Sequence, residues 1–244
     1  MKTVLRLGLL GGSGRMGRKV VQVLGETEYQ GRIQLVSAPP RGGDLTPLLD
    51  ADVLIDFALP EAVVELLEVA GGQTKVLPAL VVASTGWKAP DLDGLRKLGK
   101  SIPILQSSNF SVGALALRQV LKNSAPFLAR LGYQPVVLEI HHKMKRDAPS
   151  GTAKMLRDSL TQVPDGFVAS DVEIHSIRAG DVIGDHEAQF FGTHDRIVLA
   201  HYAQDRAVFA RGAIEAACWL AGRGPGFYTL EDFFKEAVLS RPSV

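Results

Sequence analysis

The sequence predicts an α/β fold that combines a parallel-sheet domain with a second, α+β domain containing an open mixed sheet. Through the first half of the chain, short apolar runs alternate with amphipathic segments, a pattern typical of parallel strands joined by crossover helices. A glycine-rich turn follows the first apolar run. After about Leu131, strand-like runs follow one another with few helical segments between them, which favours an antiparallel or mixed sheet.

Each element of the first domain has its own signal. Strands are expected at the apolar runs Val4–Leu10, Ile33–Ser37, Val53–Phe57, Leu80–Ala83 and Ile102–Gln106. Helices are expected at Arg15–Leu24, from Pro60 to the pair Gly71-Gly72, from Asp91 to Leu98, and after Ser111. Proline favours the first turn of a helix, serine can cap a helix through its hydroxyl, and glycine marks helix ends.

The second half of the chain predicts the other domain and then a return to the first. Strands are expected at Pro135–Ile140, Val172–Ile177, Ala188–Phe191 and Ile197–Ala203. An apolar helix is expected near Ala207–Leu220, followed by a glycine-rich segment and a short amphipathic tail. We expect this tail to pack back on the first domain.

Composition and charge exclude several classes of protein. With 46% hydrophobic and 22% charged residues over 244 positions, the chain can bury a large core and is not disordered. A formal net charge of +1 gives no overall field that would attract nucleic acid or an anionic membrane. No apolar run approaches the roughly 18 residues of a membrane span. The expected partner is therefore a small molecule.

The expected compartment is the cytoplasm. Cys218 is the single cysteine, so no internal disulfide can form, and this cysteine usage fits a reducing compartment. Its apolar neighbours favour a buried structural thiol over a reactive one. The N-terminal segment Met1–Arg6 lacks the pattern of a secretion signal.

The glycine-rich turn has the spacing of a dinucleotide-binding loop. Gly12, Gly14 and Gly17 form the pattern G-x-G-x-x-G between an apolar run and an amphipathic helix. Glycines let backbone N–H groups approach a diphosphate, and the helix N-terminus adds favourable partial charge. The alternatives are a purely structural turn and the phosphate loop of nucleotide hydrolases. Arg18-Lys19 argues against the latter, which requires Lys followed by Ser or Thr. We predict a Rossmann-like domain.

The end of the second expected strand bears on the choice of cofactor. An acid about 20 residues beyond the glycines usually binds the ribose 2′-hydroxyl of NAD. The segment Ser37–Arg41 contains no acid, and Arg41 can face a 2′-phosphate. NADPH is therefore the preferred donor, with NADH still possible.

A loop in the second domain concentrates acid–base groups and anion donors. It covers Glu139–Ala153, from a strand end to a helix start. The hydroxyl and backbone N–H groups of Ser150–Thr152 suit a helix N-terminus that holds a carboxylate. Lys145 adds a positive charge, and His141 or His142 can donate a proton near neutral pH.

Less specific explanations of this loop stay open, because a basic segment is often only a solvated surface loop. Nucleic-acid binding is disfavoured, since no aromatic residues interleave to stack bases. Metal binding by His141 and His142 together is disfavoured, because neighbours on a strand point to opposite faces, and we predict no metal site. The remaining histidines are interpreted as structural or surface residues, with a slight exception for His186 because of its glycine-flanked loop: His175, His186, His194 and His201.

Several motifs together carry a resemblance to one family. They are Gly14–Gly17, Asp56-Phe57, Ser84–Trp87, Asn109–Ser111, Glu139–Ala153, and Arg178–Asp181 with Gly184–His186. In this order they resemble the motifs of the dihydrodipicolinate reductases, also called 4-hydroxy-tetrahydrodipicolinate reductases, of diaminopimelate and lysine biosynthesis. The resemblance spans nearly the whole chain.

The resemblance implies a domain organisation and a set of site residues. Residues 1–111 and 206–244 would form the dinucleotide-binding domain, and 112–205 the substrate-binding and oligomerisation domain of a homotetramer. Cofactor contacts are implied at Gly11, Gly12, Ser13, Gly14, Arg15, Met16, Arg41, Phe57, Ala83, Ser84, Thr85, Ser108, Asn109 and Phe110. Substrate contacts are implied at Thr85, His142, Lys145, Ser150, Gly151 and Thr152. His141 matches the family's proposed proton donor, and Lys145 its second catalytic residue.

The implied reaction is the reduction of dihydrodipicolinate, a small dicarboxylate, by NADPH or NADH, with His141 protonating the carbon next to the one that receives hydride. The sequence departs from the family's usual residues at three places, and these departures affect only the expected choice between NADPH and NADH. They are Pro39-Pro40, Ala83-Ser84 and Ser107-Ser108. The rivals are another nicotinamide-dependent reductase of the aspartate dehydrogenase type and a dinucleotide-sensing regulator. The Lys145–Thr152 loop argues against the first, and the lack of a clustered basic helix face against the second.

Overall fold

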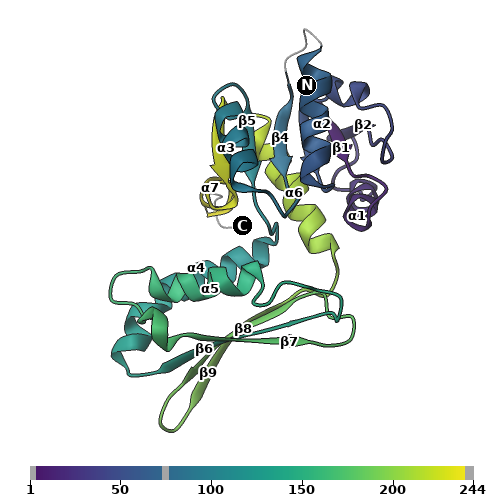
Figure 1. The fold of residues 1–244 in the computed structure, drawn as a ribbon. Helices are drawn as coiled ribbons and strands as arrows, with labels where there is room; N and C mark the ends of the chain where they lie inside the picture. The colour runs from purple at the N-terminus through teal and green to yellow at the C-terminus, as the bar shows by residue number, and fades with distance from the viewer. Residues whose placement is uncertain (1–3, 73–76, 240–244) are drawn as a thin grey trace. The chain divides into compact units, whose positions relative to one another are not determined.

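The computed structural model describes residues 4–72 and 77–239, which form two compact units (Figure 1). Unit 1 contains the described residues up to Phe110 and from Ala207 onward, and unit 2 contains Ser111–Arg206. The chain therefore leaves unit 1, builds unit 2 and returns to complete unit 1.

Unit 1 is built on a six-stranded sheet with the order β10-β5-β4-β3-β1-β2. The strands are β1 (Leu5–Leu10), β2 (Ile33–Ser37), β3 (Val53–Asp56), β4 (Ala79–Val82), β5 (Pro103–Gln106) and β10 (Gly226–Thr229). All the pairings in this sheet are parallel, so the carboxyl ends of the strands lie at one edge. β3 and β4 are buried along their whole length, as expected for strands that are covered on both faces.

Helices cover the parallel sheet. They are α1 (Arg15–Leu24), α2 (Pro60–Gly71), α3 (Ala89–Leu98), α6 (Ala207–Leu220) and α7 (Leu230–Phe233), with a 3-10 turn η1 (Thr46–Asp50) and a π-helical segment η3 (Phe234–Leu239). One buried cluster joins η1, α2 and α3 to the sheet through Leu48, Leu66 and Leu95. α6 contacts β3, β4 and β5 and packs against α1.

The sequence does not predict β10. This strand begins at the end of the glycine-rich segment Gly222–Gly226, and it pairs with β5 from Gly226 opposite Pro103 to Thr229 opposite Gln106. So short an edge strand is defined by its partner more than by its own residues. Through β10, the tail packs on unit 1 as expected.

Unit 2 contains a four-stranded sheet with the order β7-β6-β8-β9. The strands are β6 (Gln134–His141), β7 (Glu173–Arg178), β8 (Asp185–Phe191) and β9 (Arg196–Tyr202). β6 is parallel to β7 and antiparallel to β8, and β8 is antiparallel to β9. The predicted mixed sheet is confirmed, and with it the predicted fold class.

Helices cover one face of the mixed sheet. They are α4 (Val112–Arg130) and α5 (Gly151–Thr161), with a short turn η2 (Ala169–Asp171). Side chains of both helices and of β6 and β8 share one buried cluster, which includes Leu121, Leu156, Val137 and Phe190. Serine caps both helices: Ser111 Oγ accepts a hydrogen bond from Ala114 N at 3.1 Å, and Ser150 Oγ accepts one from Ala153 N at 3.2 Å.

Two further expectations concern α6 and membrane spans. Cys218 on α6 is partly rather than fully buried, and burial raises the pKa of its thiol to about 11. The thiol therefore stays protonated at neutral pH, in line with a structural role.

Within residues 4–72 and 77–239, no helix combines the length and the apolar character that a membrane span requires.

Candidate active site

The glycine turn lies at the carboxyl edge of the parallel sheet, between β1 and α1. Gly11 adopts φ +84°, and a Cβ added there would lie 2.8 Å from Ala58 N. A Cβ at Gly17 would overlap the Gly11 carbonyl and the backbone of Gly12. The turn therefore folds tightly onto the first turn of α1, with Gly14 N donating to Gly11 O at 3.0 Å. This compact backbone at a helix N-terminus suits a diphosphate.

The other predicted cofactor residues follow the carboxyl ends of neighbouring strands in unit 1. Arg41 is exposed on the loop after β2, and this loop begins beside the turn, since a Cβ at Gly12 would lie 2.9 Å from Ala38 Cβ. Thr85 after β4 and Ser108 after β5 are exposed. The remaining predicted contacts lie on the glycine turn, at the start of α1, or on the loops after β3, β4 and β5: Ser13, Arg15, Met16, Phe57, Ala83 and Asn109.

Two of the predicted cofactor residues are buried supports. Ser84 is 4% exposed, and its hydroxyl donates to Asp56 Oδ2 and accepts from Trp87 Nε1 at 3.0 Å. Phe110 is 2% exposed and its ring meets that of Phe57 edge-on, with the centroids 6.4 Å apart. A cofactor at this edge would meet the backbone of Ser84 and Phe110 rather than their side chains.

Asp56 at the end of β3 is the buried acid of this edge. Burial raises its pKa to about 6, against the opposing hydrogen bonds from Ser84 and Ala58. Ala58 N donates to Asp56 Oδ1 at 2.8 Å. Asp56 therefore links the loops that follow β3 and β4.

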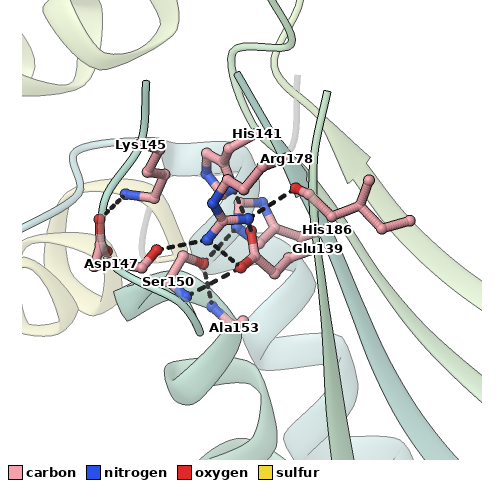
Figure 2. Close-up of polar contacts among 9 residues, drawn as sticks. Glu139, His141, Lys145, Asp147, Ser150, Ala153, Arg178 and His186 are labelled. Atoms are coloured by element: carbon pink, nitrogen blue, oxygen red, sulfur yellow. Dashed lines mark hydrogen bonds and ion pairs between the residues drawn. The ribbon is translucent and has the colours of Figure 1, made fainter. Parts of the chain in front are cut away.

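In unit 2, a cluster of charged and polar side chains surrounds Glu139 on β6 (Figure 2). The Glu139 side chain has no exposed surface. Arg178 on β7 donates to both carboxylate oxygens, from Nη1 to Oε2 at 3.0 Å and from Nη2 to Oε1 at 2.8 Å. Burial alone would raise the pKa of Glu139, but hydrogen bonds from Arg178, Ser176 and His141 outweigh it and hold the pKa at about 2. Glu139 is therefore ionised.

His141, the predicted proton donor, lies on the same buried face of β6 as Glu139. Its Nδ1 is hydrogen-bonded to Glu139 Oε2, and its ring meets that of His186 on β8 edge-on, with the centroids 5.0 Å apart. Burial lowers the pKa of His141, while the bond to Glu139 and its charge act in the opposite direction. Burial also lowers the pKa of His186, to about 3, so the His186 ring is neutral.

The start of α5 is tied into this cluster through Ser150. Its backbone N–H donates to Glu139 Oε1 at 3.3 Å, and its hydroxyl lies 3.2 Å from His186 Nε2. Ser150 is 1% exposed, and its polar groups are engaged with Glu139, with His186 and with the first turn of α5. Gly151, the first residue of α5, is exposed and Thr152 is half-buried. A carboxylate at this helix start would therefore meet Gly151 and Thr152 first.

The loop between β6 and α5 brings Lys145 to the cluster. Lys145 Nζ lies 2.8 Å from Asp147 Oδ1, and the Asp147 carbonyl accepts from Arg178 Nη2 at 2.5 Å (Figure 2). The backbone N–H of His142 donates to Val182 O at 2.7 Å, and that of Lys145 to His142 O at 3.1 Å. Lys145, half-buried like His142, is thus held on an anchored loop rather than a loose one.

The sequence alone indicates no specific role for Glu139 or Arg178, and only a slight one for His186. The structure places all three against His141. The alternation of a β-strand offered a signal for Glu139, because residues two apart share a face. Arg178 and His186 lie within the motifs that carried the resemblance, but only strand pairing brings them to β6. Of the predicted substrate residues, the structure gathers those of unit 2, whereas Thr85 belongs to unit 1.

The donor set at this cluster does not favour a metal ion. Ligand atoms of Glu139, His141 and His186 lie within 4.8 Å of one another. Both carboxylate oxygens of Glu139 already accept hydrogen bonds from Arg178, whose positive charge would repel a cation at the same place. The chemistry of this cluster is instead that of a buried carboxylate and an acid–base histidine.

A dinucleotide-type glycine turn in one unit and a buried acid–base cluster in the other are features of the α/β oxidoreductases. Residues 5–110 match the family model described as dihydrodipicolinate reductase, N-terminus, and residues 113–234 match that described as dihydrodipicolinate reductase, C-terminus. The chain belongs to the dihydrodipicolinate reductase family. The predicted resemblance is confirmed.

Relatives match along their whole length. The 4-hydroxy-tetrahydrodipicolinate reductase of Caulobacter vibrioides is 37% identical over 258 residues, covering 95% of this chain and 98% of the relative. The protein of that name from Archaeoglobus fulgidus is 34% identical over 267 residues, covering 95% and 100%. The solved dipicolinate-bound dihydrodipicolinate reductase from Paenisporosarcina sp. TG-14 has a TM-score of 0.72 at 20% identity, covering 94% of this chain and 99% of that one. This last likeness supports the fold.

Proposed function

We propose that the chain reduces dihydrodipicolinate, formed by dehydration of 4-hydroxy-tetrahydrodipicolinate, to tetrahydrodipicolinate with NAD(P)H, in diaminopimelate and lysine biosynthesis. One observation carries the proposal. The chain aligns along nearly its whole length with reductases named for 4-hydroxy-tetrahydrodipicolinate. In it, His141 and the backbone N–H of Ser150, which caps a helix start suited to a carboxylate, share the two oxygens of Glu139, and the charge of Lys145 acts on the same histidine.

The two units would divide the binding. In unit 1, the glycine turn and the N-terminus of α1 would hold the cofactor diphosphate. In unit 2, the substrate carboxylates would meet His142, Lys145, Gly151 and Thr152, with Ser150 holding the helix start in place. Charge-assisted hydrogen bonds of this kind contribute about 1.5–3 kcal/mol each, enough to fix the orientation of a small planar ring.

In the proposed reaction, a nicotinamide cofactor, when bound, would supply hydride from C4 of its dihydronicotinamide ring. Protonated His141 gives its proton to the neighbouring substrate carbon and ends as neutral imidazole. Lys145 holds a substrate carboxylate, and its side chain is aimed by the ion pair to Asp147 at 2.8 Å. When the substrate ring is held against His141, the proton is transferred within one complex. The entropic cost of bringing the two groups together is then met on binding.

Steady oxidation of NADPH on addition of freshly made dihydrodipicolinate is the direct test of this function. Oxidation of the reduced cofactor with oxaloacetate and ammonia, and none with dihydrodipicolinate, would favour the aspartate dehydrogenase alternative. Binding of NADPH without turnover of any of these compounds would favour the regulator.

We propose NADPH over NADH as the donor, on the basis of Arg41. The Arg41→Ala variant is expected to raise KM for NADPH about 10- to 100-fold, because a charged contact to the 2′-phosphate contributes about 1.5–3 kcal/mol. KM for NADH should change little. Steady-state kinetics with both cofactors measures the effect, and Arg96→Ala, which removes an exposed arginine of α3 paired with Asp93, is the control. A wild-type preference for NADH would contradict the proposal.

We propose a homotetramer whose subunits associate through the outer face of the mixed sheet. Alternation along β6 places Val137 and Glu139 toward the helices and Leu138 on the opposite face. The outer face carries apolar side chains from all four strands among polar ones such as Glu187 and Gln189. Its apolar residues are half-buried or exposed: Val136, Leu138, Ile140, Ile177, Phe191, Val198, Ala200 and Tyr202. Exposed apolar side chains gathered on one face mark an interaction site.

Light scattering on the purified protein should give about four times the 26.2 kDa of one chain. Val198→Glu should lower this mass, because it places a charge among the exposed apolar side chains of this face. Phe127→Glu, at an exposed apolar residue of α4, should leave the mass unchanged. A monomeric wild-type protein would refute the assembly.

We also infer that the enzyme works in the cytoplasm. The single cysteine, with its high thiol pKa, fits a reducing compartment. Fractionation of cells that produce the chain tests this, and recovery in the periplasmic or secreted fraction would contradict it.

A further inference from the structure

The contacts of Glu139 restrict how His141 can carry its protons. Glu139 is ionised, since Arg178 donates to both of its oxygens, and an ionised carboxylate can only accept hydrogen bonds. The His141 nitrogen that contacts it, Nδ1, must therefore carry a hydrogen and donate it. Among the described residues, Glu139 is the hydrogen-bond partner of this ring. In the neutral imidazole, the proton is thus on Nδ1 and the lone pair on Nε2.

We propose that Glu139 and Arg178 are positioning residues that hold His141 in this tautomer, so that Nε2 is the atom that delivers the proton. The proposal rests on the proposed function and deepens it. Arg178 acts through Glu139, keeping the carboxylate charged and its two oxygens in fixed directions. Neither residue is proposed to touch the substrate.

The opposite side of the His141 ring supports the assignment of Nε2. A Cβ added to Gly184, just before β8, would lie 3.1 Å from His141 Nε2 and 3.5 Å from His186 Cε1. A side chain at this position would crowd the atom that must exchange protons. Glycine at 184 therefore leaves room beside Nε2, while Glu139 engages Nδ1.

The charges around His141 show what Glu139 contributes. The groups that face the ring are Glu139 on its own strand, Arg178 on β7, His186 on β8, and Lys145 on the loop after β6. Burial and the positive charges of Lys145 and Arg178 lower the pKa of His141, and Glu139 is the neighbour that raises it. Without Glu139, His141 would lose its proton at lower pH.

The proton balance is complete within the proposed reaction. The substrate gains a hydride from the cofactor and a proton from His141 Nε2, and the oxidised cofactor is released. His141 is left neutral with its hydrogen on Nδ1, and it takes a new proton from water at Nε2. Glu139 stays ionised throughout.

The Glu139→Gln variant tests the proposal through the pH dependence of kcat. The reaction needs protonated His141, so kcat falls as pH rises through its pKa. In Glu139→Gln this fall should move about one unit or more to lower pH, because an adjacent opposite charge is lost. At neutral pH kcat should fall about 10- to 100-fold, as for the loss of other residues that orient a functional histidine. KM for NADPH should not change.

Glu173→Gln is a matched control. Glu173 and His175 have the same spacing on β7 as Glu139 and His141 on β6, and they too form an ion pair, at 3.0 Å. Their side chains are 71% and 57% exposed, so this substitution should leave kcat and its pH profile unchanged. An unchanged pH profile in Glu139→Gln, with wild-type turnover, would overturn the proposal.

A second measurement does not depend on activity, and it uses a variant only to assign a signal. Nitrogen chemical shifts of the wild-type protein with labelled histidine report which ring nitrogen carries the proton, with His141 assigned by its loss in His141→Ala. A neutral ring protonated on Nδ1 is expected, and one protonated on Nε2 would overturn the proposal. A wild-type protein inactive on dihydrodipicolinate would refute the proposed function instead, while the tautomer would still be measured.

Discussion

Replacing His141 with alanine is expected to lower kcat about 10²- to 10⁴-fold, the usual contribution of a positioned general acid. The proposed reaction needs a proton at the substrate carbon next to the one that receives hydride. His141 lies 7% exposed on the buried face of β6, next to Glu139, and alanine removes the group that would supply this proton. KM for NADPH should hardly change, because the proposed cofactor residues all lie in unit 1 and His141 lies in unit 2.

Steady-state turnover of dihydrodipicolinate, with NADPH binding followed by fluorescence, measures both quantities. His194→Ala, a histidine in the loop between β8 and β9, is the control and should keep wild-type turnover. Full turnover by His141→Ala would remove His141 from the mechanism. Loss of NADPH binding in the same variant would indicate a structural defect rather than a missing proton donor.

Replacing Gly17 with alanine is expected to weaken NADPH binding at least about 100-fold and to lower the free energy of unfolding by about 1–3 kcal/mol, the usual cost of overpacking. The added Cβ would overlap the Gly11 carbonyl and the backbone of Gly12. Backbone atoms cannot rotate away as a side chain would, so the turn itself must shift. The N–H groups proposed to hold the diphosphate would then move out of place.

The control is Gly94→Ala in α3. Outside the backbone of its own helix, a Cβ added at Gly94 would point into open space, and alanine is favoured over glycine inside a helix by roughly 0.5–1 kcal/mol. In NADPH fluorescence titrations this variant should bind the cofactor as wild type does. In denaturant unfolding it should be as stable as wild type or slightly more stable. Unchanged NADPH affinity in Gly17→Ala would contradict the role of the turn.

The elements predicted best are those whose local pattern agrees with their surroundings. The bounds of α1, β2 and α6 match the prediction, and β1 and β3 differ from it by one residue. In these elements, the apolar positions of the sequence pattern are the positions that face the core. The turn η1 and strand β10 were missed, because each owes its conformation to neighbours distant in sequence; β10 exists only as the partner of β5.

The same distinction explains which site residues the sequence could predict. His141, Lys145 and Ser150 lie within one segment, whose chemistry is readable as a unit. Arg178 and His186 come to Glu139 and His141 only through register: His141 is opposite Arg178 in the β6–β7 pairing, and Glu139 is opposite His186 in the β6–β8 pairing. No local pattern encodes those registers, so the environment that tunes the histidine emerges only with the folded sheet.

The two oxygens of Glu139 point to different parts of the site, and this has a consequence for selectivity. Oε2 meets His141, and Oε1 accepts from the backbone of Ser150, where α5 begins. A single side chain therefore sets the spacing between the proposed proton donor and the place where an acid group would be anchored. A longer analogue, with an extra methylene between its ring and its carboxylate, would be gripped at the wrong distance and left unprotonated.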